Sequence, residues 1–244
     1  MLKFVHLLTA ATLIMVGSVV AESPVPIEKV ATVADLELEV AGQIETLEKL
    51  LGEEAKFEDN EKAIHQAIGV LACMGQAIAE HPGNKETKVQ GPQLRDAALS
   101  YAEEESFQSA TKALGVLKQA QAGECKTESK VEHAWDELIE MYPLMEEMNT
   151  RNAKLVRVMK RPRGKPDEPV HATTLAVLAI AMLADTSPVF DDADIPKWQG
   201  WSNEYRENMM KVADAVRAKD GTTARQWFDK ANIACDQCHA EIRD

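Results

Sequence analysis

The chain has 244 residues, of which 45% are hydrophobic and only 5% aromatic, and its formal net charge is -13. That length allows one large or two small domains with a real core, and the acidic charge disfavours nucleic acid and anionic membrane surfaces as partners, because like charges repel. The scarcity of aromatic residues beside abundant Ala, Leu, Met, Glu and Lys favours helices over strands.

Residues 1–21 have the pattern of a secretory signal peptide. Lys3 supplies a positive start, Leu7 to Val20 form an apolar run, and small residues predict cleavage after Ala21. The run is short for a membrane span, although a retained N-terminal anchor is the alternative. We therefore expect an exported, periplasmic protein with a flexible N-terminus at residues 22–32 and no integral membrane segment after signal removal.

Apolar residues repeat at helical spacing through residues 33–127 and predict four helices there. Pro82-Gly83 should end the second helix, and residues 83–92 read as a polar loop. The third helix is expected from near Pro92 to past Tyr101, and the fourth over about residues 107–122. Two apolar stripes define the first two helices: Leu36, Val40, Ile44, Leu47 and Leu51, then Ile64, Ile68, Leu71, Met74 and Ile78.

Residues 128–244 repeat this plan. Ser129-x-x-Glu132 can cap a helix whose stripe runs from Val131 to Met159, and Pro143 should kink or restart that helix. A loop over 161–169, an apolar helix over 171–185, a helix with Trp198 to Val216 on its stripe and a last helix follow. The sequence thus predicts an all-α protein made of two tandem antiparallel four-helix bundles, at residues 33–127 and 128–244.

A short motif near the C-terminus carries the chemistry. Residues 235–239 read Cys-Asp-Gln-Cys-His, which is the attachment signature of c-type haem. Residues three and four apart share one helix face, so Cys235 and Cys238 can meet the two vinyl groups of one porphyrin as thioethers, and His239 can ligate the iron. Thr223-x-x-Gln226 is expected to cap the helix that carries the motif.

Two other uses of paired cysteines fit this chain less well. A redox dithiol would start a helix in a βαβ setting, and no strands are predicted here. A structural zinc site would want a second ligand pair, which the sequence lacks. Cys73 and Cys125 remain outside the motif, and in an oxidising compartment they form either a disulfide or free thiols.

With this motif, its four helices and a first helix rich in Met, the segment 129–244 resembles the cytochrome c′ family, the class II c-type cytochromes. Arg243 matches the basic residue that commonly follows the haem histidine of that family. The resemblance implies an exported four-helix bundle with one covalent haem c. Because members of the family usually form homodimers, it also implies a homodimer. The additional first half puts that homodimer in doubt, because a second bundle could occupy the same surface.

The first half looks like a degenerate, haem-free copy of the second. Its counterpart of the motif reads Ala122-Gly-Glu-Cys125-Lys126, which lacks one thiol and the histidine. Chance similarity between helical bundles is the alternative to a duplication. Three further correspondences favour a duplication: Gly69-Val-Leu-Ala72 with Ala176-Val-Leu-Ala179, Pro92 and Tyr101 with Pro196 and Tyr205, and Cys125 after the fourth helix with Cys238 after the eighth.

The sixth iron ligand separates the two main functions that the resemblance implies. In the family, the first helix of the bundle faces the distal side of the haem, where an apolar residue leaves the iron open to gases and a Met makes it six-coordinate for electron transfer. Met141, Met145 and Met148 share one helix face, and Met145 is our predicted sixth ligand, with core packing as the alternative. His133 and His171 are expected at surface or helix-terminal positions.

We therefore expect a mono-haem electron carrier with an unidentified redox partner protein. A five-coordinate NO- or CO-binding protein and a haem-containing interaction module are the alternatives. No nucleophile–base pair or phosphate-binding loop suggests an enzyme. Aromatic residues of the second half either stack on the porphyrin or fill the core, and they are Trp198, Trp201, Tyr205 and Trp227.

Overall fold

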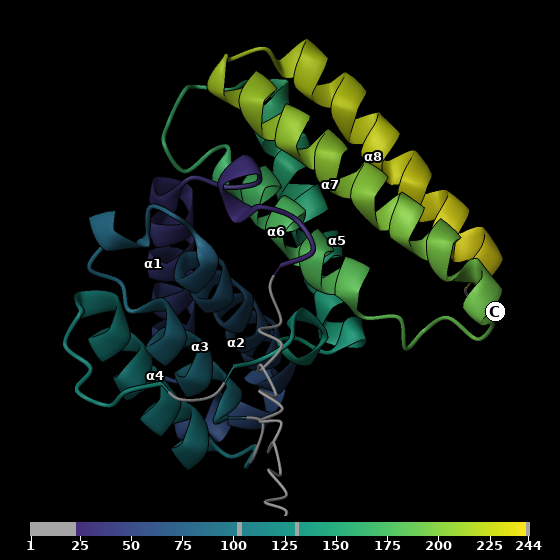
Figure 1. Ribbon diagram of the computed structural model, residues 1–244. Coiled ribbons are helices and arrows are strands. Elements are labelled where there is room, and N and C mark those ends of the chain that lie inside the picture. Colours follow the sequence, from purple (N-terminus) through teal and green to yellow (C-terminus); the bar gives the residue numbers. More distant parts are fainter. Residues whose placement is uncertain (1–22, 102–103, 130–131, 243–244) are drawn as a thin grey trace, which may run out of the picture.

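The computed structural model describes residues 23–101, 104–129 and 132–242 (Figure 1). Over these residues the protein is all-helical, as predicted, without a strand. The predicted signal peptide at residues 1–21 lies outside the described residues, as does Arg243. The α-helices are α1 (Val33–Leu50), α2 (Phe57–Glu80), α3 (Gly91–Leu99), α4 (Phe107–Ala122), α5 (Met141–Lys160), α6 (Val170–Ala184), α7 (Ile195–Arg217) and α8 (Gly221–Ile242).

Short 3-10 helices join several of these elements. They are η1 (Ile27–Lys29), η2 (Glu54–Lys56), η3 (Asn84–Glu86), η4 (Trp135–Glu137) and η5 (Asp192–Asp194). The first of them lies in the segment that we expected to be flexible, where the side chain of Ile27 is buried in the core. None of the described helices is long and apolar enough to cross a membrane.

The apolar stripes predicted for α1 and α2 are buried throughout. Helices α2 and α3 approach each other backbone to backbone, because both carry glycine at the crossing. A Cβ atom added at Gly75 would lie 2.6 Å from the backbone nitrogen of Arg95, and one added at Gly91 would lie 2.6 Å from the carbonyl oxygen of Gly75. Glycine is therefore required at this contact.

Two boundaries in the first half follow local hydrogen bonding. The third helix ends at Leu99, before Tyr101 rather than past it, and the hydroxyl of Ser100 bonds to the carbonyl oxygen of Ala97. The fourth helix matches its predicted bounds. Ser106 caps it through a hydrogen bond from the backbone N–H of Ser109, and Gly123 ends it in the left-handed conformation with φ 78°.

Two predicted helix starts in the second half are wrong. The expected helix from Ser129 is replaced by η4 and by α5, which begins at Met141 and holds Pro143 in its first turn, where a missing N–H costs nothing. The final helix begins before Thr223, because the carboxylate of Asp220 accepts the N–H of Thr223 at 2.9 Å and the hydroxyl of Thr223 at 2.7 Å. Asp220 therefore caps the helix in place of Thr223.

The helices gather in two groups that share one core. In Figure 1, α1–α4 lie on one side of the molecule and α5–α8 on the other. Within each group the helices pack in a ring, since each contacts the next and the fourth contacts the first. Helices α1 and α2 also pack against α5 and α6, and the buried apolar residues of both groups form a single continuous cluster.

A buried ion network crosses this contact between the groups. The guanidinium of Arg151 on α5 bonds to both carboxylate oxygens of Glu39 on α1, with Nη1 at 2.9 Å from Oε2, and its Nε lies 2.6 Å from Oε1 of Glu147. The hydroxyl of Thr174 on α6 also donates to Glu39 at 2.9 Å. Three helices are thus tied together by charges that are almost completely removed from water.

One of the correspondences behind the proposed duplication agrees with the structure, and two do not. Pro92 and Pro196 each occupy the first turn of the third helix of their group. Tyr101, however, follows α3, whereas Tyr205 lies within α7. Cys238 lies inside α8 and not after it, so its suggested equivalence to Cys125, which follows α4, is wrong.

Candidate functional site

A cavity of about 900 Å³ lies at one end of the second group of helices. Cys235, Cys238 and His239 of α8 line it on one side. Met141, Met145 and Met148 of α5 line it as well. The cavity therefore brings together the three motif residues and the three methionines that the sequence analysis singled out.

The motif lies in the last two turns of α8. This agrees with the prediction that the motif is part of the C-terminal helix. Cys238 is buried, Cys235 is half-buried and His239 is exposed. Burial, followed by the charges of Cys238 and Asp236, raises the pKa of the Cys235 thiol to about 12, and burial raises that of Cys238 to about 11. Both side chains are therefore uncharged thiols at neutral pH.

These thiol properties argue against a redox dithiol. Reactive cysteines have lowered pKa values, and the positive end of a helix dipole at the N-terminus is one common cause. The motif occupies the opposite end of α8, and both thiol pKa values are raised. All four cysteines are free, so Cys73 and Cys125 are not joined to each other.

A small metal ion at the motif is also poorly supported. In the part of the chain that the structure describes, one group of three metal-ligating side chains converges within 4.8 Å, and it is formed by Glu61, His65 and Glu105. Cys235, Cys238 and His239 are not such a group. Side chains that line one wide cavity without converging on a point suit an extended ligand better than a single ion.

A chain of polar groups closes part of the cavity wall. The hydroxyl of Tyr205 on α7 donates to Oδ1 of Asn152 at 3.4 Å, and Nδ2 of Asn152 donates to Oδ1 of Asn232 at 3.5 Å. Burial and the nearby Cys235 thiol raise the pKa of Tyr205 well above its ordinary value. These contacts join α5, α7 and α8 beside the motif.

Aromatic residues complete the lining. Trp198 and Trp201 of α7 line the cavity together with Tyr205. Trp227 does not line it, and the ammonium groups of Lys211 and Lys230 lie 4.3 and 4.1 Å from the centroid of its ring. The loop between α6 and α7 contributes Phe190, which is 96% exposed. Sequence reasoning missed Phe190, because helical periodicity says nothing about the path of a loop.

His133 and His171, which we expected at surface or helix-terminal positions, do not line this cavity. His171 sits in the first turn of α6, near Arg151, and burial together with the charge of Arg151 lowers its pKa to about 4. His133 lies 3.8 Å from a carboxylate oxygen of Asp96 and 3.7 Å from one of Glu137. Neither histidine lines the cavity that holds the motif.

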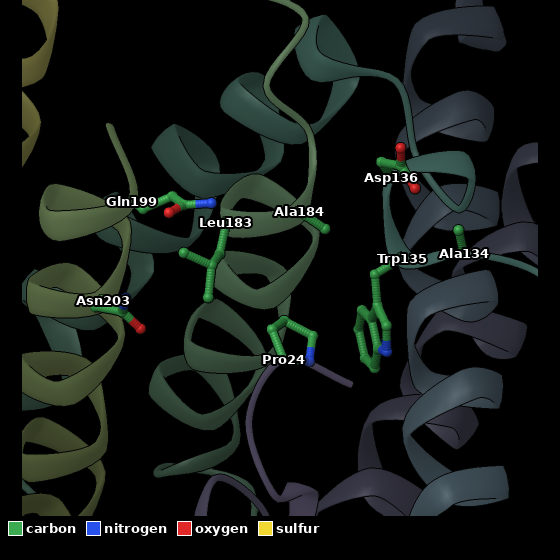
Figure 2. Close-up of a pocket in the computed structure, with 8 residues that line it drawn as sticks. All are labelled: Pro24, Ala134, Trp135, Asp136, Leu183, Ala184, Gln199 and Asn203. Carbon is green, nitrogen blue, oxygen red and sulfur yellow. The ribbon is translucent and has the colours of Figure 1, made fainter. Parts of the chain in front are cut away.

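A second, smaller pocket of about 410 Å³ lies between the N-terminal segment, η4, the end of α6 and α7 (Figure 2). Its lining includes Pro24, Trp135 and Leu183, and Asp136 is its one ionisable residue. The indole N–H of Trp135 bonds to the carboxylate of Glu80 at 3.2 Å. This pocket contains no residue of the motif, so the larger cavity is the better candidate site.

The larger cavity fits a haem in size and in chemistry. Its volume is in the range of cofactor pockets, and its wall combines Met, Trp, Tyr and Ile side chains with Asn and Ser side chains and two carboxylates, Glu146 and Asp236. It supplies two uncharged thiols three residues apart and an adjacent imidazole, which is the donor set that covalent haem attachment uses.

No protein-family model, no curated protein and no solved structure matches this chain. Function therefore has to be inferred from the residues and the geometry of the cavity.

Proposed function

We propose that this protein is an exported mono-haem electron carrier, similar to the class II c-type cytochromes and built from two tandem four-helix bundles. The observation that carries the proposal is that Cys235, Cys238 and His239 line one cavity with the methionines of α5. The rings of contacts within α1–α4 and within α5–α8 support the bundle description.

Each part of the cavity has a defined task in this proposal. Cys235 and Cys238 would hold the haem through thioether bonds, and His239 would ligate its iron. The haem supplies one-electron chemistry when bound. The Met and Trp side chains of the wall would shield the haem from water, while the net charge of -13 favours approach of a cationic partner protein.

Helix α5 provides the candidate for the sixth ligand. We keep Met145 as the proposed ligand, and Met141 and Met148 are its matched comparisons, because all three line the cavity from the same helix. A thioether ligand raises the potential of the iron and leaves no open position for gases.

Expression in a periplasm that contains the haem-attachment machinery tests the proposal. The intact mass of the purified chain should show both removal of residues 1–21 and addition of one haem. The variant Cys235→Ser/Cys238→Ser should lack that added mass. A wild-type protein without it would overturn the proposal.

The absorption spectrum of the reduced protein then identifies the coordination. We expect sharp low-spin bands that carbon monoxide does not change, and Met145→Ala should convert them to a high-spin spectrum, unlike Met141→Ala and Met148→Ala. A wild-type spectrum that is high-spin and shifts with carbon monoxide would instead identify a gas-binding protein. Low-spin bands that survive Met145→Ala would reject Met145 as the ligand.

A further inference from the structure

We propose that Glu61, His65 and Glu105 bind one divalent transition-metal ion, with Zn²⁺ as the representative, where α2 meets the connection between α3 and α4. This site lies in the first group of helices, apart from the cavity that contains the cysteine motif. It does not depend on haem attachment.

The fold brings the three side chains together from two segments. Glu61 and His65 are four residues apart on α2 and therefore share one face of that helix. Glu105 comes from the connection between α3 and α4, and its Oε2 lies 3.9 Å from Nε2 of His65. One ligand atom from each of the three lies within 4.8 Å of the others.

These separations are close to those of a bound ion. Zinc lies about 2.0 to 2.2 Å from nitrogen and oxygen ligands in a tetrahedral arrangement, so two ligand atoms on one ion are about 3.4 Å apart. The separation of 3.9 Å between His65 and Glu105 exceeds this distance by about half an ångström. Glu61 and Glu105 are exposed, so a small rotation of either side chain can close the remaining gap.

A buried hydroxyl beside the cluster gives an independent indication. Tyr101 is 1% exposed, and its hydroxyl oxygen has no hydrogen-bond partner in the described part of the chain. The tyrosine ring packs edge-on against His65, with 5.1 Å between ring centroids. Leaving a buried hydroxyl without a partner costs about 1 to 3 kcal/mol, so such groups call for an explanation.

The electrostatics place this hydroxyl within the field of the same two glutamates. Burial, followed by the charges of Glu105 and Glu61, raises the pKa of Tyr101 to about 12. Water held on a cation at the cluster can accept the hydrogen of Tyr101, and the cation offsets the two carboxylate charges. No Lys or Arg among the described residues pairs with either carboxylate.

The ligand set selects the class of metal. One imidazole with two carboxylates suits zinc and other first-row transition ions, which accept nitrogen ligands. Calcium takes six to eight oxygen ligands and gains little from an imidazole. We therefore expect clear discrimination between Zn²⁺ and Ca²⁺.

The test is calorimetric titration of ZnCl₂ into the full mature chain, purified without a histidine tag and stripped with a chelator. The variant Cys235→Ser/Cys238→Ser is titrated in parallel, so that zinc bound in this variant cannot be held by the thiols of α8. His133→Gln is the matched control, since that imidazole also lies near two carboxylates but belongs to no converging group. Circular dichroism verifies that each variant is folded.

We expect one zinc ion per chain in both backgrounds, and at least about tenfold weaker binding in His65→Gln and in Glu105→Gln. Tyr101→Phe should weaken binding less, while His133→Gln should leave it unchanged. Zinc should also raise the melting temperature, because it ties α2 to a connecting segment. Binding that survives His65→Gln, equal affinity for CaCl₂, or no binding to the cysteine-free variant would each overturn the proposal.

Discussion

Replacing Arg151 by Met removes the cation at the centre of the buried network between the two groups of helices. The side chain of Arg151 is 1% exposed, while Glu39 and Glu147 are 5% and 6% exposed. Breaking a buried ion pair from one side costs about 3 to 5 kcal/mol, because the opposite charge stays buried without compensation. Here two carboxylates lose their partner, so we expect a loss at or above the lower end of that range.

The pH dependence of this loss follows from Glu39. Burial raises the pKa of Glu39, but the charge and hydrogen bonds of Arg151 outweigh this and hold the pKa below its ordinary value of 4.5. In the native protein this carboxylate therefore contributes stability above pH 4.5 that is lost on acidification. Without Arg151, burial alone raises the pKa, so the folded variant takes up a proton more readily and its deficit should shrink from pH 7 towards pH 5.

Urea denaturation followed by circular dichroism measures both effects. Arg225→Met is the matched control, because Arg225 pairs with Asp229 at 2.7 Å on the surface, with side chains 56% and 52% exposed. That exposed pair should contribute less than about 0.5 kcal/mol. A loss below about 1 kcal/mol for Arg151→Met, or a deficit that does not change with pH, would refute the reasoning.

Four further variants test the packing, the helix capping and the titration of the fold. Gly75→Ala should destabilise the protein by about 1 to 3 kcal/mol, because the added Cβ atom clashes with the backbone of α3. Gly42→Ala should stabilise it by about 0.5 to 1 kcal/mol, because a Cβ atom at this position of α1 meets no atom within 4 Å. Thermal melts measure both changes. Ser106→Ala removes the cap of α4 and should cost about 1 kcal/mol in urea titrations. His171 has a lowered pKa of about 4, so stability should fall as pH drops from 6.5 towards 4, and His171→Gln should flatten that profile; an unchanged profile would contradict the assignment.

Those parts of the fold that depend on local pattern could be predicted from the sequence. The stripes of α1 and α2 are buried because a helix must turn one face to the core, and a period of 3.6 residues reveals that face. The motif at Cys235 lies within a helix, as expected, because its spacing is itself helical.

Features that depend on contacts between distant segments could not be predicted. Glu39 and Arg151 are 112 positions apart, and nothing in either local sequence indicates that they pair. The start of α5 at Met141 was missed because Ser129 and Glu132 imitate a capping box, while the chain actually runs through η4 with Trp135 buried. The cluster at His65 escaped notice because Glu105 joins it from a loop.

Helix α5 contributes both to the cavity and to the buried ion network. One side carries Met145 and Met148 into the cavity, and another carries Glu147 and Arg151 into the ion network with α1. Sliding or rotating this helix to reshape the cavity would pull the guanidinium out of register with Glu39. The contact of α1 with Arg151 therefore fixes the position of α5 in the cavity wall, so the first half of the chain stabilises the shape of a cavity in the second half.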